Sequence, residues 1–175
     1  PDTKVETSPG YMTVNGSMIR DARNYGSLSM SGVIAKSSNV GISKIALSLD
    51  PERQWGMYQK LGLGASTGSG FPGEAVGRLS VSALHNDFER ASLAFGYGLS
   101  VTPLQLARAY AAIAADGVLR PIGFLEDDEL TPSDDVRVMS VKNAQSVRKM
   151  MEFVVSDAGT GRLAQVINYS VAGKT

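Results

Sequence analysis

The feature that most constrains this chain is the run Ala-Lys-Ser-Ser-Asn-Val-Gly at residues 35–41. It brings the hydroxyl of Ser37, the carboxamide of Asn39 and the ammonium of Lys36 close together in the sequence. Apolar residues lie at helical spacing before and after the run, which predicts a junction between two helices, where a side chain held on both sides still faces a cleft. Serine and asparagine are also ordinary residues at the start of a helix, and the run taken alone favours that structural role.

A second run, Ala-Gly-Lys-Thr at residues 172–175, shifts the interpretation towards catalysis. Alternating residues from 167 to 174 predict a strand that carries Lys174 and leads into Thr175. Ser-x-Asn followed much later by Lys-Thr forms two of the three parts of the signature of penicillin-interacting serine enzymes. The third part, Ser-x-x-Lys, carries the nucleophile and is expected before Ser37, where this chain does not contain it.

Two other patterns match known catalytic or phosphate-binding motifs only by chance. Ser146 and Lys149 form a Ser-x-x-Lys, but the pair follows the Ser-x-Asn run and lies on the predicted solvated face of a helix. A lysine on that face cannot lose enough hydration to act as the base. The end of the chain, Gly-Lys-Thr, resembles a phosphate-binding loop, yet Asn168 occupies the position of the required glycine. We therefore expect neither a nucleophile at Ser146 nor an ATPase.

Composition excludes several classes of function. The chain has 175 residues, no net charge and 43% hydrophobic residues, so it fits a folded domain or part of one and does not suggest a nucleic-acid partner. Cysteine is absent, which excludes thiol catalysis and cysteine metal sites, and we expect no metal or cofactor. The single histidine, His85, lies in a polar connection and is expected at the surface. No signal peptide or membrane-spanning run is present, and a start at Pro1 without methionine is expected of a processed or excised piece.

Local signals predict the elements between the two runs. Asn15-Gly16 predicts a hairpin over residues 11–20. Thr102-Pro-Leu-Gln105 is a capping box, and the alanine-rich helix it opens is expected to run to Gly117 as a closely packed central helix. The other expected elements are helices over 28–36, 40–49, 51–61 and from 140, strands over 118–125 and 136–139, a glycine-rich loop over 62–78, a glycine turn at 95–98 and an acidic turn over 126–135.

With these blocks in hand, the chain resembles the transpeptidase domain of class B penicillin-binding proteins, and residues 36–41 are similar to the version found in division-specific enzymes. Residues 95–107 and 117–121 support the resemblance, while residues 120–140 contribute little. The resemblance implies an α/β (α+β) fold shared with serine β-lactamases, in which a helical subdomain packs against an antiparallel sheet. In this chain that fold is incomplete: residues 1–175 are its C-terminal part, with 1–117 mostly helical and 118–175 forming sheet with a flanking helix.

The resemblance also implies a reaction and roles for five residues. A serine attacks the D-Ala-D-Ala end of a stem peptide, and the acyl-enzyme passes to an amine on a neighbouring stem. Three residues are expected to be catalytic. Ser37 relays a proton, and Asn39 donates a hydrogen bond to the substrate amide. Lys174 places a positive charge beside both Ser37 and the substrate carboxylate. Thr175 and Ser38 are expected to bind substrate. Because the nucleophile segment lies outside the chain, the chain alone is expected to be inactive.

Partners and location follow from the same resemblance. β-Lactams are expected as covalent ligands, and membrane-bound division and glycosyltransferase proteins as partners through other regions. The catalytic domain is expected in the periplasm, anchored to the bacterial inner membrane, with this piece soluble. Two alternatives stay open at this point: a serine β-lactamase or β-lactam sensor, and a binding module that kept the fold without activity. The intact Ser37, Asn39 and Lys174 argue against the binding module.

Overall fold

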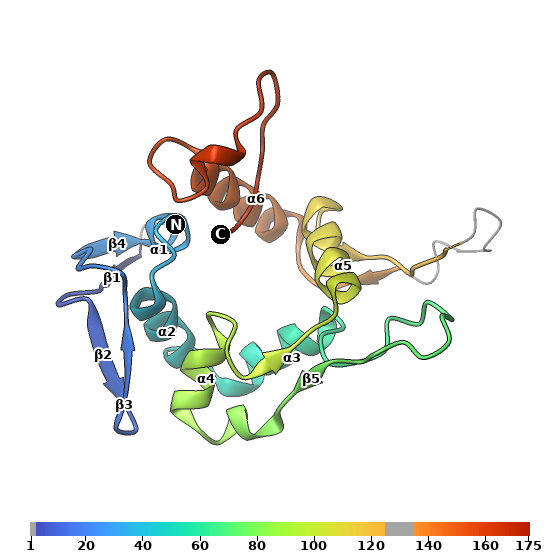
Figure 1. Cartoon of the computed structure of the whole chain (residues 1–175), viewed down its shortest axis with the longest axis horizontal. Helices are drawn as coiled ribbons and strands as arrows, with labels where there is room; N and C mark the ends of the chain where they lie inside the picture. The colour runs from blue at the N-terminus through green and yellow to red at the C-terminus, as the bar shows by residue number, and fades with distance from the viewer. Residues whose placement is uncertain (1–2, 125–134) are drawn as a thin grey trace. The chain divides into compact units, whose positions relative to one another are not determined.

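A computed structural model describes residues 3–124 and 135–175 (Figure 1). Their contacts divide the chain into two compact units. The first unit consists of Pro1–Pro51, Val81–Tyr97 and Val147–Thr175, and the second of Glu52–Ser80 and Gly98–Ser146. Each unit combines segments from both sides of residue 117. The predicted division into a helical part, 1–117, and a sheet-forming part, 118–175, stays a prediction. Helices mixed with two-stranded antiparallel sheets agree with the predicted α/β (α+β) class.

The strands of the first unit form two separate antiparallel pairs. Strand β1 (Lys4–Glu6) pairs with β4 (Ser27–Ser29), and β2 (Tyr11–Val14) pairs with β3 (Ser17–Arg20). The second pair is the predicted hairpin, since its turn places Asn15 and Gly16 at positive φ angles of 49° and 78°. The helix predicted over 28–36 begins later than expected, because residues 28 and 29 belong to β4.

The first unit also contains several helical segments. They are α1 (Met30–Ala35), α2 (Asn39–Leu47), the 3₁₀ turn η1 (Val81–Leu84), α4 (Asp87–Leu93), the end of α6 (Val141–Val155) and the 3₁₀ turn η3 (Arg162–Ala164). Helix α2 packs against α4, and the buried hydroxyl of Ser43 donates to the backbone carbonyl of Ala91 at 3.2 Å. The core that they share with the hairpin centres on Val14, Ile19 and Ala91. His85 is exposed, as predicted.

The second unit contains most of α3 (Pro51–Lys60), α5 (Pro103–Ala114), the start of α6 and two strand pairs. Strand β5 (Arg78–Leu79) pairs with β6 (Leu99–Ser100), and β7 (Val118–Leu119) pairs with β8 (Val136–Arg137). The predicted capping box is confirmed, since Thr102 and Gln105 exchange hydrogen bonds of 3.0 and 3.1 Å. Gln105 is buried and also donates to the carbonyls of Ala65 and Val76, so the start of α5 fixes the glycine-rich loop.

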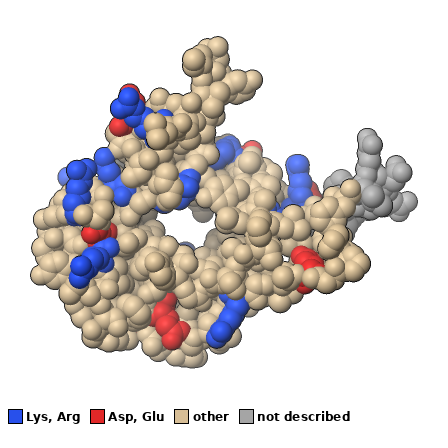
Figure 2. All heavy atoms as spheres, viewed as in Figure 1, with Lys and Arg blue, Asp and Glu red and all other residues tan. Residues whose placement is uncertain are grey.

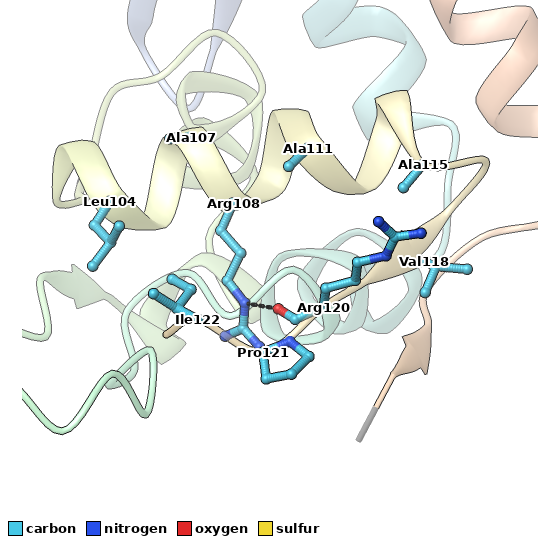
Figure 3. A pocket seen from close by; sticks show the side chains of 9 residues that line it. All are labelled: Leu104, Ala107, Arg108, Ala111, Ala115, Val118, Arg120, Pro121 and Ile122. Atoms are coloured by element: carbon cyan, nitrogen blue, oxygen red, sulfur yellow. Dashed lines mark hydrogen bonds between the residues drawn. The ribbon is translucent and has the colours of Figure 1, made fainter. Parts of the chain in front are cut away.

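Helix α5 is not the closely packed central helix that its alanines predict. Gln105, Ala109 and Ala112 are buried, whereas the expected apolar face, formed by Ala107, Tyr110, Ala111 and Ala114, is exposed. Part of that face lines an open groove of about 280 Å³, across which Arg108 donates to the carbonyl of Arg120 at 2.8 Å (Figure 3). Small side chains permit close packing on a helix face, but they do not supply the element that would cover it.

The strand predictions at the end of the chain need a larger correction. Residues 167–174 form no strand in this structure, and Ile167 and Tyr169 are 87% and 77% exposed. An alternating pattern becomes a strand only when a neighbouring strand pairs with its backbone groups. The strands predicted over 118–125 and 136–139 are likewise reduced to β7 and β8, and the acidic turn falls almost wholly outside the described residues.

Two negative findings apply to the described residues. None of their helices is both long enough and apolar enough to cross a membrane. Nor do three or more His, Asp or Glu side chains within residues 3–124 and 135–175 gather in a way that could hold a metal ion.

Glu74 anchors the glycine-rich loop of the second unit. Its carboxylate accepts hydrogen bonds from the Thr67 backbone N–H at 2.9 Å, the Thr67 hydroxyl at 2.6 Å and the Ser66 hydroxyl at 2.7 Å, with Ser69 more distant at 3.4 Å. These donors stabilise the ionised form and lower the pKa of Glu74 from its usual 4.5 to about 2. The loop is therefore held by a carboxylate that must stay charged.

We expect Glu74→Gln to remove an acid-sensitive part of the stability. A lowered pKa in the folded state stabilises the fold above the ordinary pKa, and this contribution disappears as the pH falls from about 4.5 to about 2. The difference in melting temperature between wild type and Glu74→Gln should thus be largest near neutral pH and shrink across that interval. Glu152→Gln, an exposed change on α6, is the control. A difference that does not depend on pH would contradict this role of Glu74.

Candidate active site

Ser37 lies in the turn that joins α1 to α2, as the sequence predicts. The N–H of Ser37 bonds to the carbonyl of Ile34 at 3.2 Å, and the N–H of Ser38 bonds to that of Val33 at 3.0 Å. These two bonds form a Schellman motif, in which the residue after the cap adopts left-handed backbone angles and is usually glycine. Here that residue is Ser37, with φ at 53°. A serine in this conformation costs about 1 kcal/mol, so its presence suggests a use for the hydroxyl.

The next residue, Ser38, has a structural role. Its side chain is buried, accepts a hydrogen bond from the N–H of Gly41 at 2.9 Å and donates to the carboxylate of Asp21 at 2.6 Å. The other oxygen of Asp21 accepts from the N–H of Val40 at 2.9 Å. The side chain of Ser38 therefore caps α2, while Ser37 stands outside the cap; a substrate-binding role of Ser38 stays a prediction.

Asn39 is the first residue of α2 and is half-buried. Its side-chain amide donates to the backbone carbonyl of Arg20 at 3.1 Å. A carboxamide also has a second N–H and an oxygen with which to meet a substrate amide. Arg20 and Asp21, at the end of the hairpin, thus hold both polar residues after Ser37. Sequence reasoning missed this support, and its only visible sign is a charged pair where the hairpin ends.

Ser37, Lys174 and Thr175 come together although they are far apart in the sequence. The ammonium of Lys174 donates to the hydroxyl of Ser37 and to the backbone oxygen of Thr175. The hydroxyls of Ser37 and Thr175 are 3.3 Å apart. Partial burial lowers the pKa of Lys174, because the charged form loses hydration. The predicted contact between Ser37 and Lys174 is confirmed, and all these groups belong to the first unit.

A loop after α6 completes this arrangement and was missed by the sequence analysis. Thr160 bonds to the carbonyl of Ala35 through its N–H at 3.2 Å and its hydroxyl at 3.1 Å. Its hydroxyl oxygen also lies 2.6 Å from that of Thr175. Lys36 donates to the carbonyl of Ala158 in the same loop at 2.6 Å. The sign available in the sequence was a threonine between two glycines, Gly-Thr-Gly, shortly before the Lys-Thr pair.

The competing Ser-x-x-Lys has none of these features. Ser146 is exposed and donates to the carbonyl of Lys142 one turn earlier in α6, and Lys149 is exposed as well. This agrees with the expectation of a chance match. On the face seen in Figure 2, basic and acidic side chains are interspersed among many uncharged residues, without one continuous basic surface. The candidate site is thus the group formed by Ser37, Asn39, Lys174 and Thr175.

Comparisons with known proteins identify the family of this chain. The family model for the penicillin-binding protein transpeptidase domain matches residues 1–175. The peptidoglycan D,D-transpeptidase FtsI of Escherichia coli is 41% identical over 162 residues, which cover 93% of this chain and 27% of that protein. The probable peptidoglycan D,D-transpeptidase PenA of Neisseria meningitidis is 40% identical and is covered to 28% of its length.

Solved structures give the same result for the fold. The transpeptidase domain of penicillin-binding protein 3 from Burkholderia pseudomallei, determined without ligand, is 45% identical and superposes with a TM-score of 0.93 over 99% of this chain. The chain spans 53% of that structure and little more than a quarter of the curated relatives. The fold is therefore that of a penicillin-binding transpeptidase domain, of which this chain forms a part. The chain belongs to the penicillin-binding protein transpeptidase family.

Proposed function

We propose that the complete protein is a serine D,D-transpeptidase that cross-links peptidoglycan stem peptides through an acyl-enzyme and reacts covalently with β-lactams. The observation that carries this proposal is the hydrogen bond from Lys174 to Ser37, two residues separated by 137 positions. A lysine desolvated beside a hydroxyl held in a strained turn is a suitable arrangement for proton transfer. The names of the relatives favour a transpeptidase over a β-lactamase or an inactive binding module.

The site residues receive distinct roles in this proposal. Ser37 passes a proton to the leaving nitrogen, with its hydroxyl kept in place by Lys174. The same ammonium attracts the carboxylate at the end of the stem peptide, an attraction that is stronger where water is partly excluded. Asn39 donates to the substrate amide, and Thr175 donates to the carboxylate. The nucleophile and its base come from a Ser-x-x-Lys outside these residues.

Location and partners follow from the proposed substrate. Peptidoglycan lies outside the inner membrane, so we place the catalytic domain in the periplasm, anchored to that membrane by another part of the protein. A role in septal cell-wall synthesis is supported by the similarity to FtsI. Partner proteins of the division machinery and a glycosyltransferase would then bind through other regions, while this part of the domain binds the stem peptide.

Two substitutions of Ser37 test the role of its hydroxyl. Both Ser37→Ala and Ser37→Gly remove the hydroxyl, so we expect each to slow acylation of the complete protein by at least about 10²-fold. They should differ in stability, since glycine relieves the positive φ that alanine keeps, and Ser37→Gly should be more stable by about 1 kcal/mol.

The measurements are the rate of labelling by a fluorescent penicillin and the midpoint of urea unfolding. Ser146→Ala, which removes an exposed hydroxyl from α6, should be labelled like wild type. Wild-type labelling of Ser37→Gly would exclude the proposed relay, and absence of labelling in the wild type would exclude the proposed function itself.

A further inference from the structure

The hydroxyl groups around Lys174 form a continuous chain of contacts. It runs from the Lys174 ammonium to Ser37, from Ser37 to Thr175 at 3.3 Å, from Thr175 to Thr160 at 2.6 Å and from Thr160 to the carbonyl of Ala35 at 3.1 Å. One end of the chain, an ammonium, has only protons to donate, and the other end, a carbonyl, can only accept. The direction of the bond between Thr175 and Thr160 follows from the carbonyl end.

A hydroxyl has a single proton to donate, and this fixes the direction of the contact between the two threonines. Thr160 donates to Ala35, and Thr175 must then supply the proton for its contact with Thr160. Ser37 accepts from Lys174 and directs its own proton to Thr175, whose backbone oxygen lies at 3.2 Å and whose hydroxyl lies at 3.3 Å. Without substrate, the Thr175 proton is thus directed at Thr160, and its oxygen is directed at Ser37.

We infer that Thr160 is a positioning residue, which holds the hydroxyl of Thr175 in the orientation required before substrate arrives. This inference rests on the proposed function, in which Thr175 donates to the substrate carboxylate. When the carboxylate binds, the Thr175 proton turns from Thr160 to the ligand, and the Thr160 hydroxyl then donates to the Thr175 oxygen while its backbone N–H keeps the bond to Ala35. Thr160 also ties the Lys-Thr segment to the last residue of α1, directly before the turn that carries Ser37.

The test compares variants of Thr160 in the complete protein. Thr160→Val keeps the shape of the side chain and the backbone bond to Ala35 but removes the acceptor for Thr175. We expect the second-order rate constant for acylation by a fluorescent penicillin to fall about three- to tenfold, the range for one neutral hydrogen bond. Thr160→Ser restores the hydroxyl and should restore the rate. Thr13→Val, a matched change at an exposed strand position, should have no effect.

A double-mutant cycle separates positioning from folding. If Thr160 acts through Thr175, then Thr160→Val should cause no further loss in a Thr175→Val background, whereas independent structural effects add. Equal loss in Thr160→Ser and Thr160→Val, additive losses or a wild-type rate in Thr160→Val would each overturn the inference. Should Thr160→Val fail to fold, Thr160→Ala takes its place in the cycle.

Failure of the proposed function gives a different result, because the wild-type protein itself would then not be labelled. The inference also has a test that needs no reaction. A crystal structure of the complete protein should place the Thr160 and Thr175 hydroxyls within hydrogen-bond distance, and a structure that separates them would overturn the inference whatever the labelling shows.

Discussion

Replacing Lys174 with alanine in the complete protein should slow acylation by a fluorescent penicillin by roughly 10²- to 10⁴-fold, the usual contribution of a positioned acid–base group. The ammonium donates to Ser37, so its loss leaves the relay hydroxyl without its donor. It also removes the cation proposed to attract the substrate carboxylate. No other lysine in the described residues is bonded to Ser37, so nothing there can replace it.

The lysine also predicts a pH dependence. Burial lowers the pKa of Lys174, so its donating, protonated form is lost at a lower pH than for an exposed lysine. Acylation should therefore fall as the pH rises through that lowered pKa, and in Lys174→Arg this decline should move to higher pH, because a guanidinium stays protonated. Lys149→Ala, an exposed change on α6, is the control for the alanine variant. Wild-type labelling of Lys174→Ala would rule out the proposed role.

The features that sequence reasoning predicted correctly are those whose cause lies within a few residues. The Asn15-Gly16 turn needs only two residues with positive φ, and the capping box needs only Thr102 and Gln105 at the right spacing. Helix α6 likewise begins where Ser140 accepts a hydrogen bond from the N–H of Asn143. These bonds form inside one turn of chain, so distant residues have little influence on them.

The predictions that failed concern segments that need a neighbouring strand or a packing surface from another part of the fold. The pattern over residues 167–174 is correct for a strand, but no neighbouring strand among the described residues pairs with it. The alanines of α5 allow close packing, yet one side of the helix stays open. In both cases the sequence indicates what a segment is suited to, and the structure of this chain does not provide the surface that would complete it.

The candidate site shows the same division. Ser37, Asn39 and Lys174 were predicted because the family resemblance links two motifs, and helical or strand periodicity alone would not have paired them. The supporting residues Asp21 and Thr160 escaped notice, since a carboxylate after a hairpin and a threonine between glycines are common and have meaning only through their contacts. Ser38 shows the converse: its position in the motif predicts substrate binding, which stays a prediction, while its burial and its bonds to Asp21 and Gly41 give it a second role as a helix cap that the motif does not indicate.

A large loss of stability is expected from Gly117→Ala. Gly117 follows α5 with φ at +87° and is buried, and its carbonyl accepts hydrogen bonds from Val138 at 2.9 Å and Met139 at 3.3 Å. A Cβ at this position would clash with the backbone oxygen of Met139 and lie 2.7 Å from its Cγ. Because the backbone of that segment is fixed by the same hydrogen bonds, it cannot move away without breaking them.

The expected loss adds two terms. An alanine with left-handed backbone angles costs about 1–2 kcal/mol, and a clash in a packed region costs about 1–3 kcal/mol more. Gly98→Ala separates the two terms, since Gly98 has a similar φ of +81° but no atom within 4 Å of the added Cβ. Urea unfolding of the complete protein should therefore show a loss of about 2–5 kcal/mol for Gly117→Ala and only the first term for Gly98→Ala. Equal losses in the two variants would contradict a contribution from the close contact between Gly117 and Met139.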